Sequence, residues 1–348
     1  MRYHPNQRGF DEFAGFLNGG MDYFNWILDI NGQPQRSDGR YLTDIFSGLA
    51  SAFIKRHAAE PFFLYVAYNA PHSPLQAPLT EIEAYRDVGR FNEAVCRLYA
   101  MIHRVDIGVE RILETLRACG IDENTLVLLT SDNGPWLGEQ RVPDGRPFPM
   151  MRFNGPLRGM KQDVLEGGIR VPAIVRWPAR LPSGARTDAP VHFCDWLPTL
   201  TAAVGATARA AHPPDGDNVL AALDGEPLDR KRTWFWQYSR YAPVVGCNAA
   251  VRDGPWKLVW PKMPAAMEKL PIDNVWYRGM FSVPYFETPI DRTPVERALP
   301  KPQRPELYHL VDDPAESRNL ARQYPDRVRQ MTLMFADWFD DIEVSRRR

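Results

Sequence analysis

The sequence has 348 residues, of which 44% are hydrophobic and 24% charged, and its formal net charge is −1 at pH 7. This balance is typical of a globular protein with a sizeable core, and it gives no electrostatic reason to expect nucleic-acid or membrane-surface binding. Because no run reaches about 18 apolar residues, we expect no membrane span.

The first quarter of the chain predicts a packed loop, a helix and a strand. Residues 5–26 mix aromatic residues and glycines without a helical period, which is typical of a loop. Residues 41–58 repeat apolar residues at helical spacing and predict a helix with its N-cap at or just before Thr43. Residues 62–68 are apolar and aromatic, and they predict a buried strand.

His72 follows that predicted strand, on a loop between Pro71 and Pro74. The two prolines restrict the backbone around the histidine. A lone histidine is usually structural, whereas one held beyond a strand end is a candidate for function, so both interpretations stay open.

Residues 92–118 give the clearest helical period, with Gly120 as the expected C-cap. A strand predicted at residues 125–130 follows, and a helix-to-strand step is typical of a parallel sheet. Asp132 and Asn133 come at the end of this strand, where ligands bind in open α/β sheets. Their two oxygen donors suit calcium or magnesium, not zinc, although an isolated Asp-Asn pair is more often a turn.

Lys161 lies beyond a glycine-containing turn and could bring a positive point charge to an anion, although alone it would be a surface lysine. Trp136, Arg141 and Arg152 lie between the two motifs, and their position suggests that they line a substrate pocket. Glu166 and Arg170 are expected to form a structural ion pair. Residues 171–177 predict a third strand, and residues 194–200 begin a further helix.

The last third of the chain changes character. Four short aromatic segments predict strands, at residues 233–238, 249–252, 256–260 and 306–310, and residues 325–342 predict a closing helix. We therefore predict two domains, an α/β domain over residues 1–228 and a small α+β domain over residues 229–348, with an antiparallel sheet and one helix. The four scattered cysteines show no metal spacing and are expected to be free thiols.

Five segments together resemble the sulfatases, the arylsulfatase-type members of the alkaline phosphatase superfamily. They are PNQRGFDEF at residues 5–13, APHSP at 70–74, SDNG at 131–134, GMK at 159–161 leading to EGGIRVP at 166–172, and ELYHLVDDP at 306–314. Any one of these segments is a weak signal, but all five occur in the order found in the family. The resemblance implies an alkaline-phosphatase-like mixed sheet flanked by helices.

The resemblance also implies roles for four residues. Asp132 and Asn133 would be two of the ligands of a calcium ion. Lys161 would bind a sulfate oxygen and the ester oxygen, stabilising the charge that develops there. His72 would bind sulfate on the leaving-group side and protonate the departing alcohol or phenol. The implied substrate is a small-molecule or carbohydrate sulfate ester.

The sequence departs from the family at the nucleophile. Sulfatases use a formylglycine made from Cys or Ser in a Cys/Ser-x-Pro/Ala-x-Arg motif, and no cysteine or serine opens that motif here. The early Asp-Asp pair and the Gly-Lys-x-His segment are also absent. One Asp and one Asn supply too few of the six to eight oxygens that calcium prefers. We therefore expect an incomplete site without turnover, since residues that act as a unit fail together.

Three interpretations follow from this departure. The chain is the C-terminal part of a sulfatase whose first segment is missing, or it is a short non-catalytic binding module, or it is a fragment of a related phosphodiesterase or phosphonate hydrolase. The segment from Lys161 to Pro172 favours a sulfatase over the third. The family is usually secreted, periplasmic or lysosomal, but residues 1–7 do not form a signal peptide, so the location of this chain stays open.

Overall fold

The structure is a computed structural model that describes residues 4–151, 154–206, 212–228, 230–271, 273 and 297–347. The chain forms two compact units. The large unit comprises residues 1–115, 133–170 and 234–348, and the small unit comprises residues 116–132 and 171–233. This division into units does not test the domain boundary expected at residue 228, which stays a prediction.

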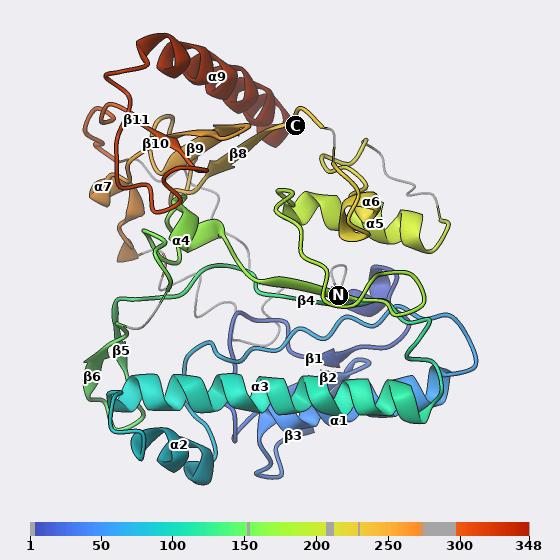
Figure 1. The fold of residues 1–348 in the computed structure, drawn as a ribbon. Helices are drawn as coiled ribbons and strands as arrows, with labels where there is room; N and C mark the ends of the chain where they lie inside the picture. The colour runs from blue at the N-terminus through green and yellow to red at the C-terminus, as the bar shows by residue number, and fades with distance from the viewer. Residues whose placement is uncertain are drawn as a thin grey trace. The chain divides into compact units, whose positions relative to one another are not determined.

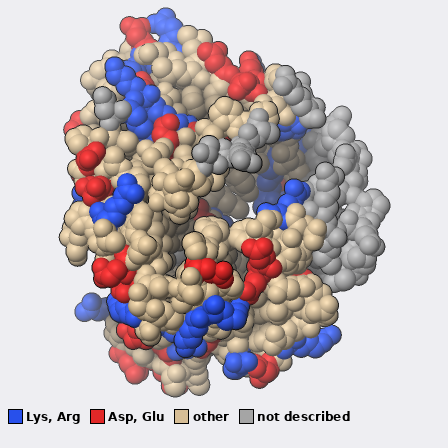
Figure 2. All heavy atoms as spheres, turned by 90° about the vertical axis from the view of Figure 1, so that its right-hand side faces the viewer, with Lys and Arg blue, Asp and Glu red and all other residues tan. Residues whose placement is uncertain are grey.

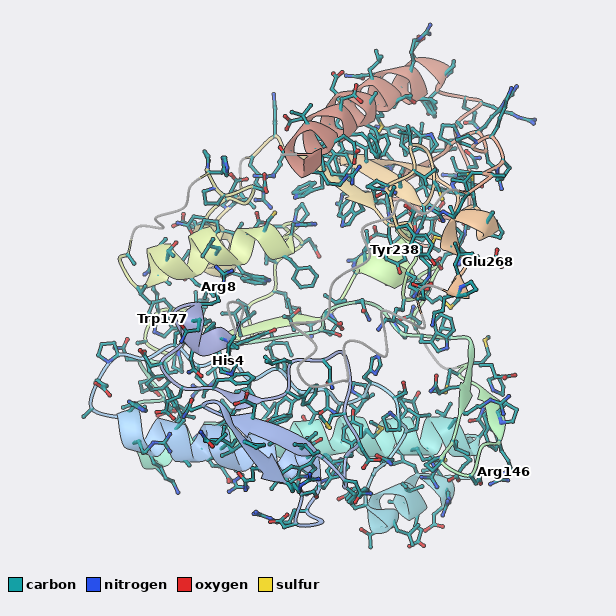
Figure 3. All side chains as sticks on the ribbon, turned by 180° about the vertical axis from the view of Figure 1, so that it is seen from behind. His4, Arg8, Arg146, Trp177, Tyr238 and Glu268 are labelled. Carbon is teal, nitrogen blue, oxygen red and sulfur yellow. The ribbon has the colours of Figure 1, made fainter. Side chains whose placement is uncertain are left out.

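The large unit begins with a 3-10 turn and a small antiparallel sheet. The turn η1 spans Pro5–Gln7, and His4 and Arg8, labelled in Figure 3, flank it as its cap residues. The strands are β1 (Ala14–Gly15), β2 (Ile27–Ile30) and β3 (Gln33–Arg36), and β2 pairs with both others. Asn31 and Gly32 take positive φ values of 50° and 86° and form the tight turn between β2 and β3.

Three helices follow in the large unit: α1 (Leu42–His57), α2 (Leu79–Arg86) and α3 (Glu93–Ala118). The two long helices α1 and α3 confirm the helices predicted from the sequence, and they lie side by side (Figure 1). Thr115 Oγ1 donates a hydrogen bond to Ser51 Oγ at 3.1 Å between them. Gly108 permits this approach, because a Cβ atom there would lie 2.3 Å from Ser47 Oγ.

The buried strand predicted at residues 62–68 is wrong. The segment alternates between half-buried and exposed residues as a strand would, but it is assigned to no strand, and none of its backbone groups pairs within the described residues. Phe63 and Tyr65 are 66% and 71% exposed. An apolar run alone does not supply the neighbouring strand that would bury it, and the described residues contain no such strand beside this segment.

A four-stranded antiparallel sheet with one helix confirms the predicted C-terminal architecture. Its strands are β8 (Thr233–Gln237), β9 (Ala249–Asp253), β10 (Trp256–Trp260) and β11 (Glu306–His309), in the order β11-β10-β9-β8. Helix α9 (Pro325–Arg347) lies along this sheet in Figure 1 and packs Met331 and Phe335 against Leu258. Each of these buried side chains contributes about 1.5–3 kcal/mol of hydrophobic free energy. The short helix α7 spans Pro264–Met267.

The rest of the large unit holds the short hairpin of β5 (Glu139–Arg141) and β6 (Pro147–Pro149) and the single-turn helix α4 (Glu166–Ile169). Figure 2 shows that basic and acidic side chains are interspersed on the face it draws, in keeping with the near-zero net charge. Among the described residues, no helix combines the length and the apolarity needed to cross a bilayer.

The small unit contains the two-stranded sheet of β4 (Val127–Thr130) and β7 (Ala173–Arg176). Both strands were predicted, but they pair antiparallel, with Val127 opposite Arg176, so the parallel, buried arrangement is wrong. Leu129 and Ile174 are 39% and 59% exposed, since no described strand covers them. The unit also holds η2 (Phe193–Asp195), α5 (Trp196–Ala203), which confirms the predicted helix, and α6 (Leu220–Leu223).

Candidate active site

Lys161 lies on a tight turn, residues 158–170, which we call the Lys161 turn. Gly159 and Gln162 on either side of the lysine have positive φ values of 90° and 76°, which reverse the backbone twice. Asp163 Oδ2 accepts the Met160 N–H at 3.0 Å, and the Asp163 N–H donates to the Met160 carbonyl at 2.9 Å. These contacts fix the backbone from which the Lys161 side chain extends.

Glycines pack the Lys161 turn against residues 133–135. The Gly134 N–H donates to the Gly168 carbonyl at 2.9 Å, and the Lys161 N–H donates to the Pro135 carbonyl at 2.8 Å. A Cβ atom on Gly134 would lie 1.9 Å from the Gly167 carbonyl oxygen, so only glycine allows this contact. Two sequence-predicted residues, Asn133 and Lys161, are thereby brought into neighbouring backbone segments.

Lys161 differs from the other charged residues of its turn in the partners of its side chain. Arg158 donates to Tyr308 Oη at 3.0 Å, Asp163 pairs with Lys262 at 2.6 Å, and Glu166 pairs with Lys257 at 2.8 Å. The Glu166–Arg170 pair expected from the sequence is present at 3.9 Å. The half-buried Lys161, in contrast, has no hydrogen bond or ion pair from its ammonium group to any described residue. Its charge is thus available to a ligand.

His72 lies on the loop of residues 70–76, which we call the His72 loop. Its backbone is held by the buried Tyr23, whose hydroxyl donates to the His72 carbonyl at 2.9 Å. The imidazole is exposed, and its Nδ1 lies 2.9 Å from the Ser73 carbonyl oxygen. A carbonyl can only accept, so Nδ1 carries a proton and Nε2 is the atom available for a ligand. The contacts found for His72 are with Asn69, its own loop and residues 20–23, not with Asn133 or Lys161.

Asp132 and Asn133 lie where the chain passes from the small unit to the large unit. Asp132 is exposed, and the Asn133 amide Nδ2 donates to the Gly134 carbonyl at 3.0 Å. Within the described part of the chain, no three or more His, Cys, Asp or Glu residues are grouped as metal ligands. The two residues alone do not make a calcium site, because calcium takes six to eight oxygen ligands. We therefore assign no chemical step to a metal ion.

The three residues predicted from position to line a substrate pocket have different surroundings. The Trp136 ring covers Gly138, where a Cβ atom would lie 2.6 Å from the ring, and Trp136 Nε1 donates to the Glu139 carbonyl at 3.2 Å. Arg141 donates to the Gly145 carbonyl at 2.7 Å inside the β5–β6 hairpin. Arg152 lies outside the described residues. The pocket role of all three stays a prediction.

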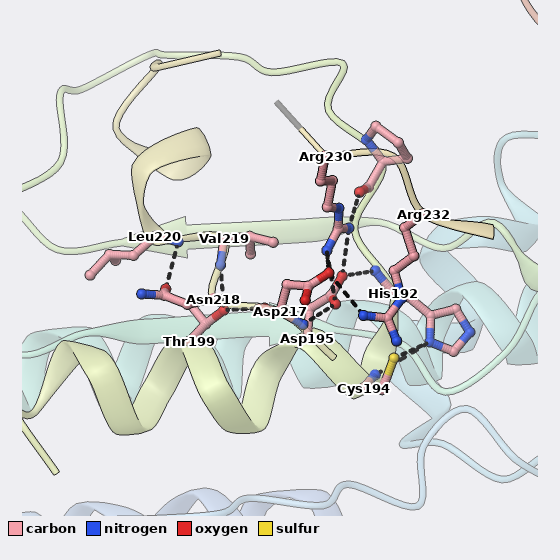
Figure 4. Close-up of polar contacts among 11 residues, drawn as sticks. His192, Cys194, Asp195, Thr199, Asp217, Asn218, Val219, Leu220, Arg230 and Arg232 are labelled. Carbon is pink, nitrogen blue, oxygen red and sulfur yellow. Dashed lines mark hydrogen bonds and ion pairs between the residues drawn. The ribbon is translucent and has the colours of Figure 1, made fainter. Parts of the chain in front are cut away.

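A second charged cluster lies in the small unit (Figure 4). Arg230 contacts the fully buried Asp195 at 2.9 Å and Asp217 at 3.1 Å, and Arg232 contacts Asp217 at 2.8 Å. Burial acts to raise the pKa of Asp195, but hydrogen bonds from Arg230 and from backbone N–H groups outweigh it and the pKa is lowered. The charged groups of this cluster pair with one another, as expected of a cluster that stabilises the fold.

The thiols of the chain are free, as expected from the sequence. In the same cluster, Cys194 Sγ lies 3.0 Å from His192 Nδ1. Burial raises the pKa of the Cys194 thiol and lowers the pKa of the His192 imidazole. Both shifts favour the uncharged pair, which is the state of an inert thiol and not of a nucleophile.

Sequence reasoning missed the buried groups behind the Lys161 turn. Lys257 is fully buried in β10, and Asn248, 2% exposed, donates to the Gln162 carbonyl at 2.7 Å. One signal was available, because Lys257 stands between Trp256 and Leu258 in a predicted strand. A lysine that faces a core from such a strand needs a buried carboxylate partner.

The sequence was compared with models of protein families and with known proteins. A family model described as Sulfatase matches residues 2–206, which is more than half of the chain. The chain belongs to the sulfatase family. It is therefore a member of the alkaline phosphatase superfamily, as the five sequence segments indicated, and its mixed α/β fold is alkaline-phosphatase-like.

Individual sulfatases are similar over different lengths. An uncharacterized sulfatase of Escherichia coli K12, YdeN, is 32% identical over 69% of this chain and 41% of its own length. The N-acetylgalactosamine-6-sulfatase of Canis lupus familiaris is 28% identical over 95% of this chain and 62% of its own length. The crystal structure of Ps i-CgsB in complex with k-i-k-neocarrahexaose has 27% identity and a TM-score of 0.74, over 97% of this chain and 68% of that chain. This chain thus spans about half the length of its curated relatives.

Proposed function

We propose that this sulfatase-family chain binds sulfate esters and carries the leaving-group half of a sulfatase site. The observation that carries the proposal is the Lys161 ammonium, which lies on a backbone fixed by glycine contacts and pairs with no described residue. A sulfate ester carries one negative charge, which an ammonium group at such a turn would attract.

His72 and Lys161 would then divide the work on the leaving group. When a nucleophile forms a bond to sulfur, the bond between sulfur and the ester oxygen breaks, and its electron pair goes to that oxygen. Lys161 would stabilise the growing negative charge, and the proton on Nε2 of a positively charged His72 would neutralise it. Nothing among the described residues is assigned to attack sulfur, because the chain has no Cys/Ser-x-Pro/Ala-x-Arg motif.

A carbohydrate sulfate ester is the substrate class that we propose. The similar structure of Ps i-CgsB was solved with a neocarrahexaose, and one of the similar sulfatases is named for N-acetylgalactosamine 6-sulfate. His72 would protonate the alcohol that leaves. Because His72 is exposed, this side of the site is open to solvent and would have room for a bulky carbohydrate.

The test is the affinity for phenyl sulfate, measured by calorimetry on the purified chain and two variants. Lys161→Met should lose at least tenfold in affinity, since it removes the charge and keeps the length. Lys262→Met is the matched control, because Lys262 pairs with Asp163 on the same turn and is 46% exposed. Equal affinities in all three proteins would refute the proposal.

A turnover assay distinguishes a chain that only binds sulfate esters from one that also hydrolyses them. We expect the purified chain to hydrolyse 4-nitrophenyl sulfate no faster than buffer, because it carries no nucleophile motif. Turnover that disappears in Lys161→Met would show that a group within these 348 residues attacks sulfur, and the assignment to the leaving-group side alone would be wrong.

A further inference from the structure

Three buried charged side chains tie the Lys161 turn to the C-terminal sheet. Lys257 Nζ lies 2.8 Å from Glu166 Oε1 and 2.9 Å from Glu316 Oε1. The side chains of Lys257 and Glu316 are fully buried, and that of Glu166 is 5% exposed. We call these three residues the buried triad.

The buried triad carries two carboxylates and one ammonium group, so its geometry has to be well defined. Glu316 Oε2 also accepts the Glu166 backbone N–H at 2.6 Å, which joins the two carboxylate residues directly. Among neighbouring charges, Arg170 lies 3.9 Å from Glu166 and Arg158 donates to the Glu316 carbonyl at 2.6 Å. Buried charges are stable only while their partners stay in place, so the triad holds its three segments in one arrangement.

The contacts continue from the buried triad to Lys161. Glu166 is followed by Gly167, whose N–H donates to the Arg158 carbonyl at 2.7 Å. A Cβ atom on Gly167 would lie 2.4 Å from the Gly159 carbonyl oxygen, and one on Gly168 would lie 2.1 Å from the Asp163 carbonyl oxygen. A shift of Glu166 therefore shifts the glycines, and the glycines shift the turn on which Lys161 lies.

Asn248, next to β9, makes a second contact between the C-terminal sheet and the same turn. Its Nδ2 donates to the Gln162 carbonyl at 2.7 Å, and its Oδ1 accepts the Val164 N–H at 3.3 Å. Gln162 follows Lys161 directly. The turn is therefore held from the C-terminal sheet at Gln162 and Val164 as well as at Glu166.

We propose that Lys257 is a positioning residue, which holds Lys161 in place for anion binding through Glu166, Glu316 and the Gly167–Gly168 step. This rests on the proposed function of Lys161. Lys257 itself touches no ligand, because it is fully buried. The C-terminal sheet is then part of the binding machinery and not only a structural appendage.

The test compares the 348-residue chain with Lys257→Met by two measurements. Hydrogen exchange of the Gly167 and Lys161 amides should become at least tenfold faster, while the amides of α1 exchange as before. Inorganic sulfate should protect Lys161 from acetic anhydride, read by mass spectrometry, and the concentration for half-protection should rise at least tenfold. Arg327→Met is the control, because Arg327 pairs with Asp253 at 3.1 Å on the C-terminal sheet and has no contact with the turn; neither measurement should change.

Lys257→Arg keeps the positive charge and alters its geometry. If Lys257→Met does not fold, the same two measurements are made on Lys257→Arg. A folded Lys257 variant with unchanged exchange and unchanged half-protection would overturn the proposal. Failure of both variants to fold would also overturn it, in favour of a general requirement for folding. Absence of sulfate protection in the unaltered chain would refute the proposed function instead, while the exchange measurement would still test positioning.

Discussion

The Lys161 turn and the His72 loop hold their side chains by different physical means. The Lys161 turn is fixed by charges and by glycines, with the buried triad behind it and backbone carbonyls packed where a Cβ atom would stand. The His72 loop has no buried ion pair among the described residues, and is held by hydrogen bonds from Tyr23 to the His72 carbonyl, from Tyr41 to the Gln76 carbonyl at 2.8 Å and from Gln76 Nε2 to the Asp22 carboxylate at 2.7 Å. The lysine therefore depends on the C-terminal sheet, whereas the histidine depends on Tyr23 and Tyr41, which precede it in the chain.

The largest expected effect tests the glycine packing of the Lys161 turn. Gly167→Ala should lower the free energy of unfolding by about 3 kcal/mol, since overpacking costs about 1–3 kcal/mol and backbone carbonyls yield little. The unfolding midpoint in urea measures this. Gly19→Ala is the control, because nothing lies within 4 Å of its Cβ position. Equal midpoints for the two variants would show that the turn is loosely packed.

The next prediction tests the charge of the buried triad. Burial raises the pKa of Glu316, against the attraction of Lys257. A carboxyl group with a raised folded-state pKa contributes stability that is complete below the unfolded-state pKa of about 4.3 and is lost as the pH rises through the folded-state pKa. Glu316→Gln removes this titration, so the stability of the variant relative to the unaltered chain should increase as the pH rises from 4 to 7.

Urea unfolding of both proteins across that pH range measures the difference. A relative stability of Glu316→Gln that decreases with rising pH would mean that folding favours the charged carboxylate, and that Lys257 outweighs burial. A difference independent of pH would mean that Glu316 does not titrate differently in the folded protein.

A smaller effect is expected at the His72 loop. Tyr23→Phe removes the hydroxyl that donates to the His72 carbonyl, and it should cost about 1 kcal/mol of stability, the usual net contribution of one hydrogen bond. Tyr65→Phe is the control, because Tyr65 is 71% exposed and lies outside the loop. If Tyr23→Phe matches Tyr65→Phe in thermal unfolding, the loop is not held by that bond.

The smallest effect is expected for the exposed ion pair on the Lys161 turn. Lys262→Met should change the free energy of unfolding by no more than about 0.5 kcal/mol, because the Lys262 side chain is 46% exposed and an ion pair to such a group contributes little. The Asp163 contacts with the Met160 backbone remain in this variant. A loss as large as that of Gly167→Ala would show that exposed charges, and not buried ones, hold the turn.

Helical periodicity predicted α1, α3 and α9, and segment order predicted the family, since both signals lie in local sequence. Strand pairing was predicted less well. Val127–Thr130 was recognised as a strand, but its antiparallel partner lies more than 40 residues away and no local pattern specifies it. The β2–β3 hairpin was missed although Asn31-Gly32 is a strong turn signal, because β3 is exposed along its whole length and lacks apolar alternation.

The candidate site was predicted in part for the same reason. Lys161 and Asn133 were selected from short motifs, and the structure brings their segments together through Gly134, Gly167 and Gly168. The partners that hold the turn could not be selected, because Lys257 and Glu316 come from segments about 100 and 150 residues beyond it in the chain. Such contacts depend on the tertiary fold.

The most direct test of the account observes the Lys161 ammonium itself. In a chain labelled with ¹⁵N-lysine, the Nζ resonance of Lys161 is assigned from its absence in Lys161→Met, and phenyl sulfate is then titrated. We predict a saturable shift of this resonance, with the resonances of Lys257 and Lys262 unchanged. A Lys161 resonance that does not move, or that moves together with Lys262 without saturation, would contradict a sulfate ester site at Lys161.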